Sequence, residues 1–168
     1  MSKLFVAQKQ GNCKLRQALV LIFTMVFLFS ITMLAQAGPD YSEEPFYGSV
    51  ELETGFTPDP HTQDIVAGGS QSLSDLGFAG FVATAPDYDL YYEAGTTFPL
   101  VLEVEPDDGV DPEDIFILVN SPDAEWHYNW NDEEGPRIRF DNPESGLYNI
   151  WIGTFGDYED TTLNITEL

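Results

Sequence analysis

The stretch Leu100-Val-Leu-Glu-Val-Glu-Pro-Asp-Asp-Gly-Val-Asp-Pro-Glu-Asp-Ile-Phe-Ile-Leu-Val-Asn120 decides the fold class of this chain. Its first six residues alternate, which directs Leu100, Leu102 and Val104 to one face of a β-strand. Residues 114–120 form a continuous apolar run of strand length, which is typical of a strand buried on both faces. Proline and glycine between these segments favour turns. The stretch therefore predicts two strands joined by a loop.

The same kind of pattern continues in both directions along the chain. Residues 49–53 alternate with Val50 and Leu52 inward. Other expected strands, the first two clearer than the rest, are 147–154, 161–168, 63–67, 78–84, 88–93, 125–130 and 137–140. Beyond residue 37, no stretch keeps a helical period for ten residues, although 71–76 could make one helical turn. Short strands separated by turns predict an all-β fold, an antiparallel β-sandwich or jelly roll.

Residues 1–37 have the three parts of a cleavable signal peptide. A basic segment precedes an apolar run from Ala18 to Leu34, which we expect to be helical, and the small-residue site Ala35-Gln-Ala37 follows. An uncleaved membrane anchor is the alternative, but the run is at the short end for a bilayer of ~30 Å. We expect a bacterial protein that is secreted, extracellular or periplasmic, and has no membrane contact after cleavage.

The net charge of −23 is distributed very unevenly along the chain. Residues 1–37 contain four cations and no acid, whereas the remainder has 29 acids against Arg137 and Arg139, a net charge of −27. Such a surface repels nucleic acid and anionic lipid, so we exclude nucleic acid as a partner. Three interpretations stay open: a solvated acidic surface, adaptation to a saline habitat, or carboxylates clustered around divalent cations.

Two further segments follow the signal peptide: an extended N-terminal arm at 38–47 and a β-sandwich domain at 48–168. The only cysteine, Cys13, is removed with the signal peptide, so the exported domain must rely on its apolar core. The arm could add a strand to a sheet edge of another copy, which would make the protein a self-assembling extracellular filament subunit. A disordered arm is the alternative.

The segment Ile138-Arg-Phe-Asp-Asn-Pro-Glu-Ser-Gly-Leu-Tyr-Asn-Ile-Trp-Ile-Gly-Thr-Phe155 is the most specific of several that match a known pattern. The others are 48–60, 66–70, 80–87 and 120–123. Together they resemble a family of secreted bacterial β-sandwich domains related to the pre-peptidase C-terminal (PPC-like) domains, some of which have serine-peptidase-like names. Relatives often carry cysteines near the positions of Phe78 and Tyr128. The resemblance implies that an aromatic pair replaces a disulfide here.

The sequence does not favour catalysis. Only His61 and His127 follow the signal peptide, and there is no G-x-S-x-G motif to present a nucleophilic serine. A serine-peptidase-like enzyme is therefore a remote alternative, and we expect a protein that is not an enzyme.

Acidic loops suggest calcium as a cofactor, because calcium takes about 6–8 oxygen ligands from carboxylates, amides and carbonyls. Gly109 would let the first loop wrap tightly around an ion. The candidate ligands are Asp107, Asp108, Asp111, Glu113 and Asp114 in that loop, and Asn131, Asp132 and Glu133 in a second. Neither loop has the EF-hand spacing.

Three aromatic residues in polar surroundings, Tyr91, Trp130 and Tyr158, are candidates for ligand binding. Aromatic side chains on a β-sandwich can stack on sugars, although most aromatic residues of a β-protein belong to its core. The sequence therefore predicts an exported, non-catalytic module that acts by binding or adhesion, is stabilised by calcium, and has glycans or other copies of itself as partners. The alternative is the self-assembling subunit.

Overall fold

The computed structural model describes residues 38–130 and 135–168. The predicted signal peptide at 1–37 lies outside the described residues. Within them, no helix has the length and apolar character needed to cross a membrane.

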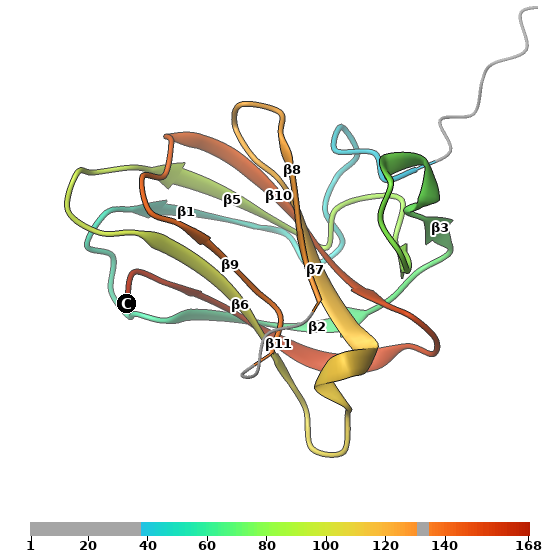
Figure 1. The fold of residues 1–168 in the computed structure, drawn as a ribbon. Helices are drawn as coiled ribbons and strands as arrows, with labels where there is room; N and C mark the ends of the chain where they lie inside the picture. The colour runs from blue at the N-terminus through green and yellow to red at the C-terminus, as the bar shows by residue number, and fades with distance from the viewer. Residues whose placement is uncertain (1–37, 131–134) are drawn as a thin grey trace, which may run out of the picture. The chain divides into compact units, whose positions relative to one another are not determined.

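The described domain is a sandwich of two β-sheets, as the sequence predicts (Figure 1). The larger sheet has the order β1 (Ser49–Glu53), β5 (Tyr88–Glu93), β10 (Gly146–Thr154), β7 (Ile115–Asn120) and β8 (Trp126–Asn129), and its short strands β4 (Phe81–Val82) and β3 (Gln71–Ser72) continue beside the end of β10. The smaller sheet has the order β2 (His61–Ala67), β11 (Glu159–Thr166), β6 (Leu100–Pro106) and β9 (Arg137–Phe140). Every pairing is antiparallel except that of β1 with β5.

The expected strands are present with small changes at their ends. The clearest change concerns 78–84, where only β4 is a strand. The expected helical turn at 71–76 is divided between β3 and the 3₁₀ turn η1 (Ser74–Leu76). A second 3₁₀ turn, η2 (Pro112–Asp114), leads into β7.

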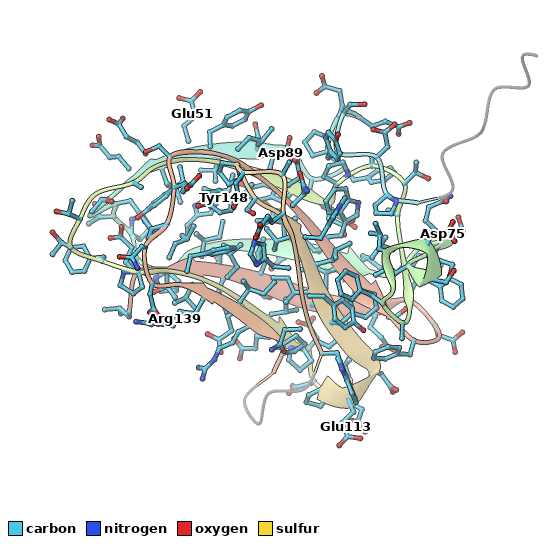
Figure 2. The ribbon with its side chains drawn as sticks, turned by 45° about the horizontal axis from the view of Figure 1, so that its top comes forward. Glu51, Asp75, Asp89, Glu113, Arg139 and Tyr148 are labelled. Atoms are coloured by element: carbon cyan, nitrogen blue, oxygen red, sulfur yellow. The ribbon has the colours of Figure 1, made fainter. Side chains whose placement is uncertain are left out.

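The main core lies between the two sheets and is built from alternate residues. Leu100, Leu102 and Val104 of β6 are fully buried there, as their spacing predicts. They pack with side chains from the opposite sheet, including Tyr148, which lies inside the domain while Glu51 and Glu113 point into solvent (Figure 2). Period-two burial of this kind fixes the register of each strand.

A second, smaller core explains why β7 is apolar at consecutive positions. Phe116 and Leu118 point away from the main core and pack with Trp151 on the outer face of the larger sheet. The segment 71–82 covers them and contributes Leu73. β7 is thus buried on both faces, which the apolar run predicts. Gly153 is required beneath Phe116, because a Cβ at that position would overlap the phenyl ring.

The aromatic pair implied by the family resemblance is present at the margin of the second core. The rings of Phe78 and Tyr128 stack with centroids 4.7 Å apart and an interplanar angle of 9°. The Tyr128 hydroxyl donates to the Ala79 carbonyl at 3.0 Å, which ties the loop of Phe78 to β8. An aromatic contact therefore connects these two segments.

The segment 38–47 is not an extended arm. It forms turns, and its backbone is bonded to its own domain: Asp40 donates to the Thr84 carbonyl at 2.7 Å and Tyr47 to the Asp87 carbonyl at 2.8 Å. The expectation of an extended segment is wrong because these N–H groups find partners in the adjacent loop.

Candidate ligand-binding site

The three aromatic residues predicted to bind ligand are all exposed, but they lie in three separate pockets. Trp130 and Tyr91 are each 46% exposed and Tyr158 is 67% exposed. Each lines a different hollow of the surface. The structure therefore offers three candidate sites, each with one predicted residue.

The pocket of Trp130, which we call the aromatic pocket, has a volume of about 530 Å³. It is lined by Gly77, Phe78, Ala79, Glu113, Asp114, Tyr128, Trp130 and Phe155. Four aromatic residues and two acidic residues, from segments that are far apart in the sequence, thus line one hollow. Only Trp130 and the two acids were singled out as functional candidates from the sequence.

The rings of the aromatic pocket are held in place by contacts behind them. Phe116, buried in the second core, packs against Tyr128 at a centroid distance of 5.1 Å and against Phe155 at 5.3 Å. Trp130 meets Phe155 edge to face at 5.8 Å and 85°. Burial raises the pKa of Tyr128, so its hydroxyl stays protonated at neutral pH. The pocket wall is therefore largely preformed.

The turn η2 positions the two carboxylates of the aromatic pocket. The Asp111 carboxylate accepts from the Glu113 N–H at 3.0 Å, and the Asp114 carbonyl accepts from the Phe155 N–H at 3.1 Å. These bonds tie η2 to the end of β10. Glu113 and Asp114 are both exposed, so their carboxylates stay hydrated at the rim.

The predicted calcium ligands are not brought together among the residues that the structure describes. Within that part of the chain, no three His, Cys, Asp or Glu side chains are arranged so that they could hold a metal ion. Asp107, Asp108, Asp111, Glu113 and Asp114 are all exposed, and Asp111 serves as a cap. The other set, Asn131, Asp132 and Glu133, lies outside the described residues. Calcium binding stays a prediction.

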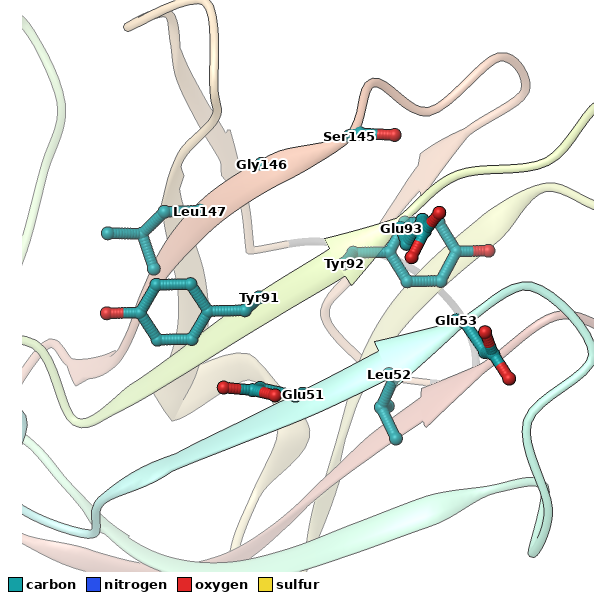
Figure 3. Close-up of a pocket in the computed structure, with 9 residues that line it drawn as sticks. All are labelled: Glu51, Leu52, Glu53, Tyr91, Tyr92, Glu93, Ser145, Gly146 and Leu147. Carbon is teal, nitrogen blue, oxygen red and sulfur yellow. The ribbon is translucent and has the colours of Figure 1, made fainter.

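Tyr91 lies on the outer face of the larger sheet, in a hollow of about 620 Å³ (Figure 3). It is paired with Glu51 of β1 on one side and Leu147 of β10 on the other. Glu53 and Glu93 are also direct neighbours, and like charges in this position repel. This hollow is acidic, and Tyr91 is its exposed aromatic residue.

Tyr158 lines the third hollow, the Asp87 pocket, which has a volume of about 420 Å³. It is lined by Phe46, Tyr47, Val66, Gly68, Gly69, Ser70, Ala83, Thr84, Asp87 and Tyr158. Asp87 is only 2% exposed, and its Oδ2 accepts from the Ile152 N–H at 2.8 Å. Burial raises the pKa of Asp87 to about 7. The sequence does not indicate a role for Asp87, because nothing local reveals its burial.

A serine–histidine contact that the sequence did not suggest occurs in the turn between β7 and β8. The Ser121 hydroxyl lies 2.8 Å from His127 Nε2 and donates to Asp123 Oδ1 at 2.6 Å. The hydrogen bond from this serine is the main cause that lowers the pKa of Asp123, so its carboxylate is ionised and accepts the hydrogen bond that the hydroxyl donates. His127 Nε2 must then donate to the serine. A general base would need a free lone pair at that nitrogen.

The similarity of this chain to known proteins concerns the fold alone. No family model matches this chain, and no curated protein matches it. The fold is similar to the pre-peptidase C-terminal domain of a collagenase from Bacillus anthracis, with 10% identity, a TM-score of 0.41, and coverage of 76% of this chain and 98% of that domain. It is also similar to PliG of Aeromonas hydrophila, a periplasmic lysozyme inhibitor of g-type lysozyme, with 16% identity, a TM-score of 0.38, and coverage of 70% and 96%.

Proposed function

We propose that this chain is an exported, non-catalytic module of the periplasm or the extracellular space, and that its aromatic pocket binds an uncharged carbohydrate. The observation that supports this is one hollow lined by four aromatic residues, with two exposed acidic residues at its rim. Its volume of about 530 Å³ lies within the range of ordinary ligand pockets.

The chemistry of the aromatic pocket suits a sugar ring. Pyranose rings have apolar C–H faces that pack on aromatic rings, and Trp130 presents such a surface with 46% of its area exposed. The carboxylates of Glu113 and Asp114 accept hydrogen bonds from hydroxyl donors. Negatively charged polysaccharides are disfavoured as ligands, because the domain itself has a net charge of −27 and repels them.

The absence of catalysis in this proposal is supported by the geometry around Ser121. The Ser121 hydroxyl donates its hydrogen bond to Asp123, and His127 therefore faces the hydroxyl oxygen as a donor. In a nucleophilic triad the acid contacts the histidine, whereas here it contacts the serine. The network closes a turn, with Ala124 in the left-handed conformation at φ 62°.

Calcium stabilisation and the alternative function, self-assembly, each need their own measurement. Calcium stabilisation predicts that millimolar calcium raises the melting temperature, and an unchanged melting temperature would remove calcium from the proposal. Self-assembly through 38–47 is the alternative function. Because the N–H groups of Asp40 and Tyr47 are bonded within the domain, assembly would require them to detach. A monomer by light scattering at high concentration would argue against it.

The sugar proposal is tested by a glycan array followed by titration of each bound glycan. Trp130→Ala should weaken binding about fivefold or more, if the sugar ring gains what a nucleobase gains on an aromatic ring, roughly 1–3 kcal/mol. Tyr91→Ala is the matched control: Tyr91 has the same exposure but lines a different pocket. Equal binding by both variants, or an array without hits, would refute the proposed function.

A further inference from the structure

The Asp87 pocket contains a carboxylate that is buried without a cation. The Asp87 carboxylate accepts a hydrogen bond from one N–H donor, that of Ile152. Burial is the largest cause of its raised pKa, and no charged neighbour contributes to the shift. The domain has no lysine, and neither of its two arginines, Arg137 and Arg139, lines this pocket. A carboxylate in this position is costly to ionise unless something outside the domain compensates its charge.

The rim of the Asp87 pocket is unusually apolar for a solvent-facing surface. Phe46 is 68% exposed, Tyr158 67% and Val66 43%. All three line the same hollow as the buried carboxylate. Tyr158 is held against the chain at Gly68, where a Cβ would come within 3.0 Å of its Cδ1 atom. An exposed apolar rim around a buried charged group is typical of a ligand pocket.

We propose that the Asp87 pocket binds an organic ammonium ion, a primary amine on an aromatic or aliphatic group, with the ammonium at the Asp87 carboxylate and the apolar part against Phe46 and Tyr158. The ammonium supplies the charge that the domain lacks at this position. An aromatic ring beside it adds a cation–π attraction. The net charge of −27 raises the local concentration of cations. This site is separate from the proposed sugar site and does not depend on it.

Protonation of Asp87 should control this binding. Its pKa is about 7, so the protonated form predominates below that pH and cannot attract an ammonium ion. Of the residues lining the pocket, only Asp87, Tyr47 and Tyr158 have titratable side chains, and Asp87 is the one carboxylic acid among them. Binding should therefore weaken as pH falls from 8 to 6, while the amine itself stays charged.

The test is calorimetric titration of the full domain with benzylamine at pH 8 and pH 6, with benzyl alcohol as the uncharged control. Benzylamine should bind and benzyl alcohol should not. The apparent affinity should fall about tenfold between pH 8 and pH 6, following the ionised fraction of Asp87. At pH 6 binding should also release a proton, which is measured by repeating the titration in buffers of different ionisation enthalpy.

Substitutions distinguish binding at the Asp87 carboxylate from general attraction of cations by the acidic domain. Asp87→Asn should reduce the affinity at pH 8 at least tenfold, and Tyr158→Ala about threefold through the lost ring. Asp75→Asn, which removes an exposed acid outside the pocket, should have no effect. Equal binding of benzyl alcohol, an unchanged affinity in Asp87→Asn, or no binding at pH 8 would each overturn the proposal. So would calcium alone competing with benzylamine, since the site would then be one for metal.

Discussion

Replacement of Asp87 by asparagine should change how the stability of this domain depends on pH. The folded state raises the pKa of Asp87 from 3.8 to about 7, so the folded protein retains this proton in a range where the unfolded chain has lost it. Stability contributed by this group therefore falls as pH rises from about 4 to about 7. The difference amounts to about 4 kcal/mol of unfolding free energy. Asparagine keeps an acceptor for the Ile152 N–H but does not ionise.

We expect the Asp87→Asn variant to match the native domain in stability near pH 4 and to exceed it by several kcal/mol at pH 8. The assay is urea denaturation of both proteins at several pH values. Because the two proteins share all other titrating groups, their difference isolates Asp87. The control Asp75→Asn should show no such trend, since Asp75 is exposed. A constant difference between Asp87→Asn and the native domain from pH 4 to 8 would show that the buried carboxylate does not hold its proton.

Three other measurements test the cores and the charge. A double-mutant cycle with Phe78→Leu and Tyr128→Leu should give a coupling of about 0.5–1.5 kcal/mol, because their rings stack at 4.7 Å; strictly additive effects in urea denaturation would contradict that contact. Gly153→Ala should destabilise the domain by about 1–3 kcal/mol through overlap with Phe116, and adding Phe116→Leu should restore part of this loss; a Gly153→Ala protein of native stability would rule out the overlap. Raising sodium chloride from about 0.05 to about 1 M should raise the melting temperature, since salt screens the repulsion within a domain of charge −27, and calorimetry showing no rise would mean that this repulsion is unimportant.

Much of the fold was predictable because strands leave a local pattern. The alternation at Leu100, Leu102 and Val104 identified the face that is buried, and the apolar run of β7 indicated burial on both sides. The segment that covers the second side could not be predicted. Residues 71–82 contain little regular structure, and they are distant from β7 in the sequence although they pack on it in the folded domain. The same reasoning failed for 38–47, whose partners lie about 40 residues later.

The candidate sites depended even more on long-range contacts. The exposure of Trp130 was inferred from its polar neighbours, but Phe78 and Phe155, which complete its pocket, come from other parts of the chain. Asp87 was overlooked because an aspartate after a proline usually marks an exposed turn. Its environment comes from other parts of the chain: Ile152 of β10 donates to its carboxylate and Tyr47 to its carbonyl.

The sequence by itself determined the sandwich architecture, the acidity of the domain and the faces of its strands, because these follow from composition and from a period of two along each strand. Only the tertiary structure decided which side chains share a pocket and which carboxylate is buried. Both are set by contacts between residues far apart in sequence, and desolvation of a charge depends on everything that surrounds it in space.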